Sequence, residues 1–442
     1  MNFTRLSSKY AQHRAFIVSS VILFVGNFVM NIMNYVYHLV VGRNVSPQVY
    51  GEAESLISLI AIVSVPAGTL LLVSAKYAAA CKAEKSSKGT RELWIFLSKK
   101  VIYYGFPLLL FILILTPFIG DFLQIDNNIA LAVMWISMFL SFFAAVNQGI
   151  LKGWQEFSKY SWVGILSTFA KFIFGVLFIW LGFELYGIIG SIVLSSLVGY
   201  VATYVFLRKR VAKKSQQENE YVLKKSDLDS LRRYIFPVFA GNLAVTLLGN
   251  VDMVVAKSVL GAVEAGQYAA LMIVSKIILY GSGIVSVVLF AMSAEKNHKG
   301  DSSKSMLFFS IFLVSVASFC AVLLYYFYPK FVLGLLFGGK YEEVSLYLVW
   351  FAIPMGLFAI LNVIFTYLLS QHKTRISYAL LALSTVFTGV LFFYATDIVS
   401  FLKVLIGAHG IALIVSCMFL FRKEKSDSQS LKTSVENLLP NN

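Results

Sequence analysis

Residues 305–328 read SMLFFSIFLVSVASFCAVLLYYFY, a stretch of 24 residues that contains no charged side chain. As a helix it rises roughly 36 Å at ~1.5 Å per residue, which suffices to cross the roughly 30 Å hydrocarbon core of a membrane. Eleven further apolar segments flank it along the chain of 442 residues. We predict an all-α polytopic membrane protein with about twelve transmembrane helices, at 15–41, 50–75, 101–120, 129–151, 161–182, 186–207, 234–256, 263–293, 305–328, 345–370, 377–396 and 399–421.

The amino-acid composition excludes other classes of protein. Apolar residues make up 58% of the chain and charged residues 13%, whereas an ordinary soluble domain has about 25% charged residues. The chain is therefore neither disordered nor an ordinary soluble globule. Its three cysteines (Cys81, Cys320 and Cys417) form neither a disulfide framework nor a metal-ligand spacing. We expect no metal site and no cofactor.

The basic residues predict the orientation in the membrane. With a cytoplasmic N-terminus, thirty of the 37 Lys and Arg residues fall into cytoplasmic segments, and only five fall outside (Arg43, Lys257, Lys330, Lys340 and Lys403). This asymmetry follows the positive-inside rule and places both termini in the cytoplasm. It also explains the net charge of +15 without nucleic acid, through basic loops beside anionic membrane lipids. We expect a multi-pass protein of the cell membrane.

The longest polar stretch divides the chain into two halves with six spans each. We predict an N-terminal lobe at 1–207, a basic cytoplasmic linker at 208–233, a C-terminal lobe at 234–421 and a cytoplasmic tail at 422–442. Each half has six spans, so both halves start on the same side of the membrane. A repeat would therefore be parallel, with its two copies related by an axis along the membrane normal. Two lobes that rock about a central cavity are typical of alternating-access transporters.

Residues of the first half match residues that lie at an offset of 215 positions further along the chain, which supports the repeat. FVGN at 24–27 aligns with FAGN at 239–242. The register continues without a gap through the pairs Val36 and Val251, Val40 and Val255, Gly51 and Gly266, and Leu56 and Leu271. Chance similarity between apolar helices is the alternative explanation.

Two stretches carry a resemblance to a known family. The first is NYVYHLVVGRNVSPQVYG at 34–51, and the second combines FP at 236–237, NL at 242–243, NVD at 250–252 and EAGQYA at 264–269. They resemble the first hairpin and the seventh and eighth helices of polysaccharide (O-antigen, Wzx-type) flippases. This family belongs to the multidrug/oligosaccharidyl-lipid/polysaccharide exporter superfamily. The resemblance implies a two-lobe protein that flips a polyprenyl-diphosphate-linked glycan from the cytoplasmic to the outer leaflet.

A polar stripe runs along the first predicted helix. Asn27, Asn31, Asn34 and His38 are spaced by four, three and four residues, so they share one helix face. Asn242 and Asn250 in the seventh helix are two turns apart and also share a face. We interpret these side chains as the lining of a wet cavity that meets sugar hydroxyls. Hydrogen bonding between neighbouring helices is the structural alternative.

Two lysines lie near mid-membrane, where a charge costs on the order of 3 kcal/mol. They are Lys171 in the fifth span and Lys276 in the eighth. The nearby acids cluster at the outer span ends, and Asp252 is separated from Lys276 by ~15 Å along the helices. An internal ion pair is therefore disfavoured, and the hypothesis is an anionic substrate, the diphosphate of a lipid carrier. Snorkelling to the interface is the alternative.

Three further residues complete the candidate set. Arg43 follows the first span and is a further substrate-binding candidate. A charged residue in a solvated loop is the alternative interpretation. Asp252 and His409 are candidates for coupling to H⁺ or Na⁺. His409 is flanked by Ala408 and Gly410, an environment that also suits a packing residue.

Two other functions compete with the flippase. A drug exporter of the same superfamily needs acidic residues in its cavity, whereas this chain carries two lysines there. A membrane glycosyltransferase or polymerase is suggested by Glu52-Ala53-Glu54, but such enzymes usually carry long external loops that this chain lacks. The expected partners are membrane lipids and a polyprenyl-diphosphate-linked glycan, with a polysaccharide polymerase and glycosyltransferases as further candidates.

Overall fold

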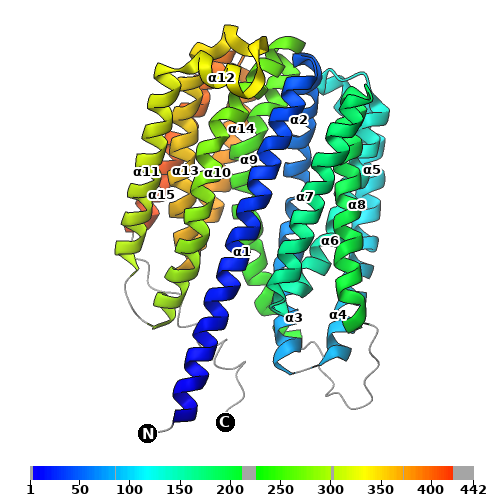
Figure 1. Cartoon of the computed structure of the whole chain (residues 1–442), viewed down its shortest axis with the longest axis vertical. Helices are drawn as coiled ribbons and strands as arrows, with labels where there is room; N and C mark the ends of the chain where they lie inside the picture. The colour runs from blue at the N-terminus through cyan, green and yellow to red at the C-terminus, as the bar shows by residue number, and fades with distance from the viewer. Residues whose placement is uncertain (1–2, 85, 212–224, 300–302, 372, 422–442) are drawn as a thin grey trace. The chain divides into compact units, whose positions relative to one another are not determined.

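The computed structural model describes residues 3–84, 86–211, 225–299, 303–371 and 373–421, and in that part of the chain every regular element is a helix (Figure 1). The elements are α1 Phe3–Asn44, α2 Pro47–Val63, α3 Val65–Ala83, α4 Ser87–Lys100, the π-helix η1 Val101–Gly105, α5 Phe106–Leu123, α6 Asn128–Gly153, α7 Phe157–Trp180, α8 Glu184–Val211, α9 Lys225–Val259, α10 Ala262–Lys299, α11 Lys304–Phe327, α12 Pro329–Phe337, the 3₁₀ helix η2 Gly339–Tyr347, α13 Leu348–Ser370, α14 Arg375–Tyr394 and α15 Ile398–Phe421.

The helices confirm the predicted all-α membrane fold. Within the described residues, eleven helices are long and apolar enough to cross a membrane, and up to twelve if the bent pair α2 and α3 forms one span. Each predicted span corresponds to one of these candidates. The third span is longer than predicted, because helical structure extends over Ser87–Leu123 through α4, η1 and α5. The protein is a multi-pass membrane protein.

Proline residues explain two local irregularities. The second span bends by 41° between α2 and α3, next to Pro66, where the sequence predicts a kink. The π-helix η1 lies directly before Pro107, which lacks the backbone N–H that an α-helical hydrogen bond to Tyr103 would need. Helix α13 contains Pro354 and continues unbroken past it.

Two compact units make up the structure. The first is formed by Met1–Val49 with Pro66–Val222, and the second by Tyr50–Val65 with Leu223–Asn442. Most of α2 therefore packs in the second unit, although the sequence-based division placed all of 1–207 in the first lobe. The linker at 208–233 and the tail at 422–442 lie mostly outside the described residues. The predicted lobe boundaries and central cavity remain predictions.

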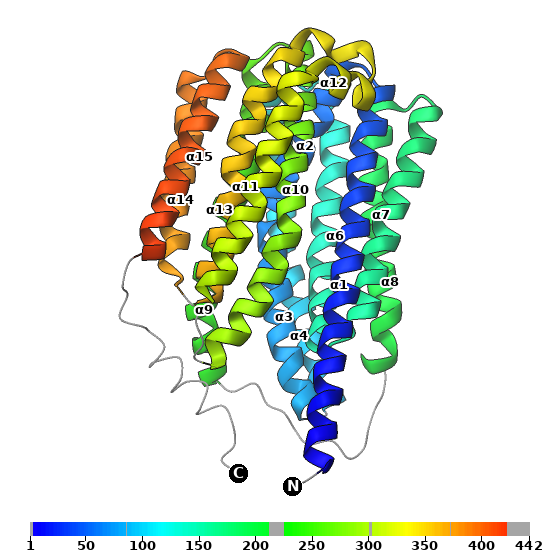
Figure 2. The ribbon, with the colours of Figure 1, turned by 60° about the vertical axis from the view of Figure 1, so that its left-hand side comes forward.

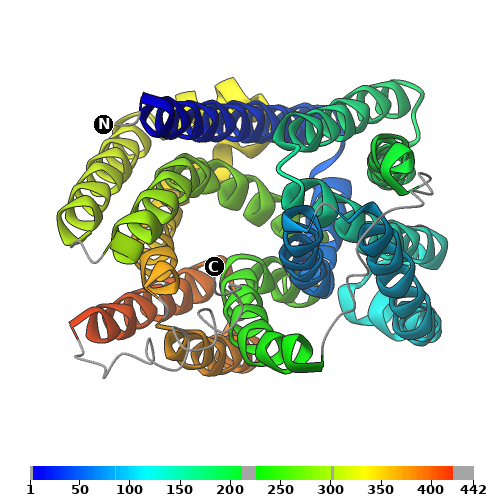
Figure 3. The ribbon, with the colours of Figure 1, turned by 90° about the horizontal axis from the view of Figure 1, so that it is seen from below.

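Helix neighbours are arranged in the same order in both units. In the first unit α1 packs on α7, α7 and α6 both pack on α8, and α5 packs on α6. In the second unit α9 packs on α14, α14 and α13 both pack on α15, and α11 packs on α13. Figures 2 and 3 show α14 beside α15 and α9 beside α14. Counted by span within each unit, the same pairs pack together. The first span packs on the fifth, the fifth and the fourth both pack on the sixth, and the third packs on the fourth. The shared order supports the predicted repeat.

A glycine–serine contact recurs at the equivalent place in each unit. A Cβ atom added to Gly26 in α1 would lie 2.7 Å from Ser161 in α7. A Cβ atom added to Gly241 in α9 would likewise lie 2.7 Å from the Ser377 hydroxyl in α14. Gly26 and Gly241 are paired by the offset of 215, so the FVGN and FAGN matches mark a repeated close contact between helices.

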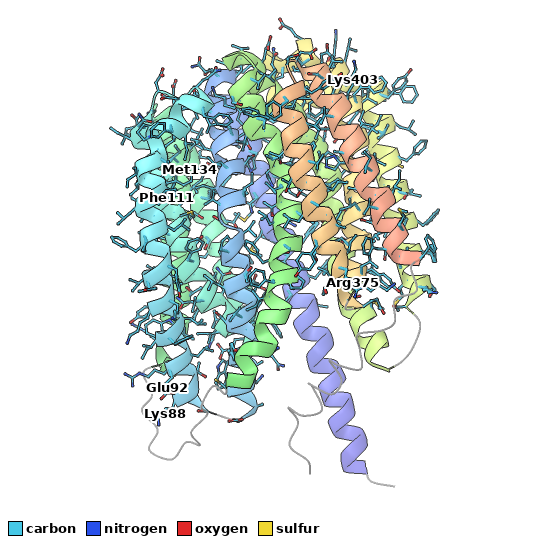
Figure 4. The ribbon with its side chains drawn as sticks, turned by 180° about the vertical axis from the view of Figure 1, so that it is seen from behind. Lys88, Glu92, Phe111, Met134, Arg375 and Lys403 are labelled. Atoms are coloured by element: carbon cyan, nitrogen blue, oxygen red, sulfur yellow. The ribbon has the colours of Figure 1, made fainter. Side chains whose placement is uncertain are left out.

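Charged side chains lie at helix ends in both units (Figure 4). In the second unit, Arg375 begins α14 at one end of the helices, and Lys403 on α15 lies at the other. In the first unit, Lys88 and Glu92 lie at one end on α4, while Phe111 and Met134 lie at mid-height on α5 and α6. The apolar middle and charged ends are the pattern expected of membrane-spanning helices.

Candidate functional site

The polar stripe of α1 lies beside the face that packs on α7. The packing face is marked by three contacts: Gly26 to Ser161, Met30 to Gly164, and Tyr37 to Gly175. Successive residues of an α-helix are rotated by about 100° around its axis, so the stripe lies ~90° around α1 from that packing face. Its members differ in exposure, since Asn31 is exposed, Asn27 and Asn34 are half-buried, and His38 is buried.

Lys171 lies directly over an aromatic ring of α1. Its Nζ atom is 4.4 Å from the centroid of the Tyr37 ring, a cation–π contact worth on the order of 0.5–2 kcal/mol. Tyr37 is held in place by its hydroxyl, which is 2.9 Å from the hydroxyl of Ser191 in α8. The ring of His38 meets Tyr37 edge-on at 5.7 Å. The first unit thus brings half-buried Lys171 next to the C-terminal end of the polar stripe.

Lys276 lies in a polar cluster of the second unit. Its Nζ atom donates a hydrogen bond of 3.4 Å to the Oδ1 atom of Asn250 in α9. Asn250 is the hydrogen-bond partner that the structure describes for its ammonium group. The sequence argument against an internal ion pair at Lys276 stays a prediction.

Asp252 is the best-defined acid of the cluster. It is 1% exposed, and its Oδ2 atom accepts a hydrogen bond of 2.7 Å from the hydroxyl of Tyr268 in α10. Its Oδ1 atom is buried and accepts no hydrogen bond from any residue that the structure describes. An under-satisfied buried carboxylate is costly unless it is protonated or meets a cation.

Glu54 is a buried residue of the second unit that the sequence reasoning missed. The sequence places it at the outer start of the second span, where a solvated loop is expected, yet it is only 2% exposed. Helix α2 carries it into the second unit, where its side chain is enclosed by protein. The match of Gly51 with Gly266 is the one sequence signal that could have linked this segment to α10.

His409 lies on α15 deep in the second unit. It is fully buried, and its Nδ1 atom lies 2.8 Å from the carbonyl oxygen of Leu405. Because a carbonyl only accepts, this contact places a proton on Nδ1. The ring meets Phe358 and Phe387 edge-on. Packing and coupling remain compatible with this position.

The other sequence candidates lie apart from these two groups. Asn242 is half-buried on α9, two turns before Asn250, and Arg43 is exposed at the end of α1. Lys257, expected near the outer surface, is 1% exposed and among the largest fully buried side chains. Within the described part of the chain, no group of three or more His, Cys, Asp or Glu residues could hold a metal ion.

Comparisons with known proteins identify relatives of the sequence and of the fold. A family described as "Polysaccharide biosynthesis protein" matches residues 17–295, more than half of the chain. No curated protein sequence matches significantly. The structure is similar to an inward-facing multidrug resistance MATE family transporter of the MOP superfamily, with a TM-score of 0.68 and 13% identity over 91% of this chain and 97% of that one.

Two further structures extend the likeness. The lipid II flippase MurJ, in an inward closed conformation, has a TM-score of 0.62 and 16% identity over 91% of this chain and 86% of its own. A MOP superfamily transporter from Pyrococcus furiosus, whose binding pocket has a reported reverse polarity, has a TM-score of 0.55 and 16% identity over 92% of this chain and 94% of its own. At these identities the likeness establishes the fold, which is that of membrane transporters and flippases.

Proposed function

The chain belongs to the polysaccharide biosynthesis protein family, and from this premise we propose that it moves a lipid-diphosphate-linked oligosaccharide from the cytoplasmic to the outer leaflet. The fold supports transport, because it is shared with MATE transporters and with a lipid II flippase. Alternating access would carry the charged head across the membrane. The protein would act in the cell membrane with both termini in the cytoplasm, beside the glycosyltransferases and polymerase that make and use the glycan.

The observation that carries this proposal is the position of Lys171. It lies about midway along α7, half-buried, over the ring of Tyr37 and beside the polar stripe of α1. A lysine ammonium is a strong phosphate ligand, and a stripe of amides can hydrogen-bond to sugar hydroxyls. The face of the Tyr37 ring orients the lysine ammonium group. We assign Lys171 to the diphosphate, and Asn27, Asn31, Asn34 and His38 to the glycan.

The second unit supports coupling more strongly than it supports anion binding. The Nζ atom of Lys276 already donates a hydrogen bond to Asn250, so an anionic substrate must compete with this amide for the lysine. Asp252 and His409 are both buried in the second unit, as a proton- or sodium-coupled element requires. We assign Lys276, Asn242 and Asn250 a secondary role in binding, and Asp252 and His409 to coupling.

A transport assay tests the proposal. The purified protein is reconstituted into vesicles that carry a fluorescent polyprenyl-diphosphate-linked oligosaccharide, and the fraction that a membrane-impermeant quencher reaches is followed over time. We expect the protein to raise the transbilayer rate well above that of protein-free vesicles. A rate equal to that of protein-free vesicles, with the imposed gradient of H⁺ or Na⁺ in either direction, would contradict a flippase.

One observation favours a second candidate, a multidrug exporter of the same superfamily. The acids that such an exporter needs are present, since Glu54 and Asp252 are both buried in the second unit. The same vesicles decide between the two functions when they are loaded with a cationic dye. Dye transport driven by an ion gradient, without movement of the glycolipid, would favour the exporter.

A further inference from the structure

The helical structure of the third span is longer than a membrane is thick. It covers Ser87–Leu123, 37 residues, which is roughly 55 Å at ~1.5 Å per residue, against roughly 30 Å of hydrocarbon. The stretch 101–120 carries no charge and suffices to cross the hydrocarbon, so α4 extends beyond it. Lys99 and Lys100, in the last turn of α4, therefore lie at the level of the lipid headgroups. Figure 4 shows Lys88 of α4 at one end of the first unit.

One side of α4 is fixed to the rest of the first unit. The helix packs on α6 and α8, and Leu93 is buried on its inner side. The Nε1 atom of Trp94 donates a hydrogen bond of 2.9 Å to the Oδ1 atom of Asn147 in α6. The Nε1 atom of Trp154, at the end of α6, donates one of 3.2 Å to the hydroxyl of Thr90 in α4. These contacts hold the opposite side of α4 in a fixed direction.

The opposite side carries basic and aromatic side chains together. Phe96, Lys99 and Tyr103 follow one another at spacings of three and four residues, and Phe96, Lys100 and Tyr104 at spacings of four, so all five share one side of the helix. Each of them is exposed. The Nζ atom of Lys100 lies 5.7, 5.9 and 5.5 Å from the centroids of the three rings, within the range of a cation–π contact. We call these five residues the headgroup face.

The charge of α4 is complementary to an anion. The helix carries four basic residues and one acidic residue, Lys88, Arg91, Lys99, Lys100 and Glu92, and all of these are exposed. The acid lies seven residues before Lys99, or ~10 Å along the helix. The end of α4 next to the membrane is therefore basic. Tyrosine rings are typical of the headgroup level, and lysine side chains extend from there toward phosphate groups.

We propose that the headgroup face binds an anionic phospholipid of the adjacent leaflet. Lys99 and Lys100 bind its phosphate, while the three rings pack against its glycerol and the upper part of its acyl chains. In the proposed orientation this is the cytoplasmic leaflet, whose negative surface potential attracts basic segments. The inference does not depend on the proposed flippase activity, because this surface lies on α4 and η1, apart from the Lys171 and Lys276 groups.

Lipid binding to the full-length protein in detergent tests the proposal. The protein is titrated with phosphatidylglycerol, or with phosphatidylcholine of the same acyl chains, and native mass spectrometry gives the affinity for the first lipid bound. We expect the wild type to prefer phosphatidylglycerol. The double variant Lys99→Gln, Lys100→Gln should bind phosphatidylglycerol about ten-fold more weakly and phosphatidylcholine as the wild type does. Equal binding of both lipids by the wild type, or no loss in the double variant, would overturn the proposal.

A matched double variant controls for overall charge. Arg208→Gln, Arg375→Gln removes the same two positive charges from exposed positions on α8 and α14. It should bind the first phosphatidylglycerol as the wild type does. A loss as large as that of the Lys99, Lys100 variant would show that net charge alone attracts the lipid, and would overturn a site on α4.

The aromatic part of the face has its own control. Tyr103 and Phe118 lie on the same continuous helix and are both 69% exposed. Tyr103→Leu should weaken phosphatidylglycerol binding by about three-fold, since it removes a ring beside the ammonium group. Phe118→Leu, well inside the apolar stretch, should bind as the wild type does. Equal affinities of the two variants would remove the rings from the site.

Two further outcomes are decisive. Displacement of the bound phosphatidylglycerol by an equal concentration of farnesyl diphosphate would assign the face to a diphosphate ligand, and would overturn the proposal of a phospholipid. If the double variant does not accumulate, the single variants Lys99→Gln and Lys100→Gln take its place, because each should lose part of the affinity. Wild-type binding by both single variants would equally overturn the proposal.

Discussion

Gly51 of α2 and Gly266 of α10 lie in backbone contact, such that a Cβ atom at position 51 would be 2.8 Å from the Gly266 nitrogen. These two glycines are also the residues that the offset of 215 aligns between the halves of the sequence. The absence of side chains lets the two helix backbones approach within van der Waals distance.

Alanine at position 51 should therefore be harmful. The atoms that its Cβ would meet belong to the backbone, which cannot rotate away, so the helices must separate. Overpacking of this kind costs about 1–3 kcal/mol. We expect Gly51→Ala to lower the thermal midpoint of the protein in detergent and to reduce the amount that accumulates in the membrane.

Gly389 provides the matched control. It lies inside α14, and a Cβ atom there would meet no atom within 4 Å. Gly389→Ala should be neutral or slightly stabilising, because alanine has the higher helix propensity by about 1 kcal/mol. Equal thermal midpoints for the two variants would show that α2 and α10 are not in close contact.

The hydrogen bond from Tyr268 to Asp252 should matter for stability. Tyr268→Phe would leave both carboxylate oxygens of a buried aspartate without a partner, at a cost of about 1–3 kcal/mol. We expect a lower thermal midpoint, and we expect Asp252→Asn to relieve part of the loss because the amide is uncharged. Tyr378→Phe, at a side chain that is 48% exposed, should have no effect. A Tyr268→Phe variant as stable as the wild type would refute the bond.

Much of the fold can be predicted from the sequence, because membrane-spanning helices follow from local composition. Each of the twelve apolar segments corresponds to a helical candidate, and Pro66 predicts the bend that follows α2. Apolar stretches of this length have no other way to satisfy their backbone groups in lipid. Helix existence is therefore a local property, which one sequence is sufficient to reveal.

The site was less accessible to sequence reasoning, because it depends on contacts between distant segments. Lys257 reads as an outer loop residue, yet it is 1% exposed. Glu54 reads as a solvated helix start, yet it is buried and its segment packs in the second unit. Neither burial nor the reach of a lysine side chain can be read from positions along a span. The stripe of α1 was predictable, since helical spacing alone defines its shared face.

The orientation of the second unit can be tested with single cysteines. Arg375 and Lys403 are exposed and lie at opposite ends of its helices. In a variant lacking the three native cysteines, Lys403→Cys should react with a membrane-impermeant maleimide in intact cells, whereas Arg375→Cys should react only after permeabilisation. The positive-inside distribution of the loops is the reason. The opposite pattern of labelling would invert the topology.

The lysine variants test the account of substrate binding. Replacing Lys171 by alanine should slow flipping by about ten-fold or more, since a hydrogen bond to a charged group is worth about 1.5–3 kcal/mol. Lys171→Arg should retain part of the activity, because the charge survives although the guanidinium directs its hydrogen bonds differently. Lys403→Ala, at an exposed lysine on α15, should flip at the wild-type rate. Protein levels should be equal in all of these variants.

The double variant Lys171→Ala, Lys276→Ala in the vesicle flipping assay tests the central claim most directly. The readout is the initial rate at which the fluorescent polyprenyl-diphosphate-linked oligosaccharide changes leaflet, normalised to the amount of reconstituted protein. If Lys171 and Lys276 bind the substrate diphosphate, this rate should fall to that of protein-free vesicles. A double variant that flips the glycolipid at the wild-type rate would contradict the account.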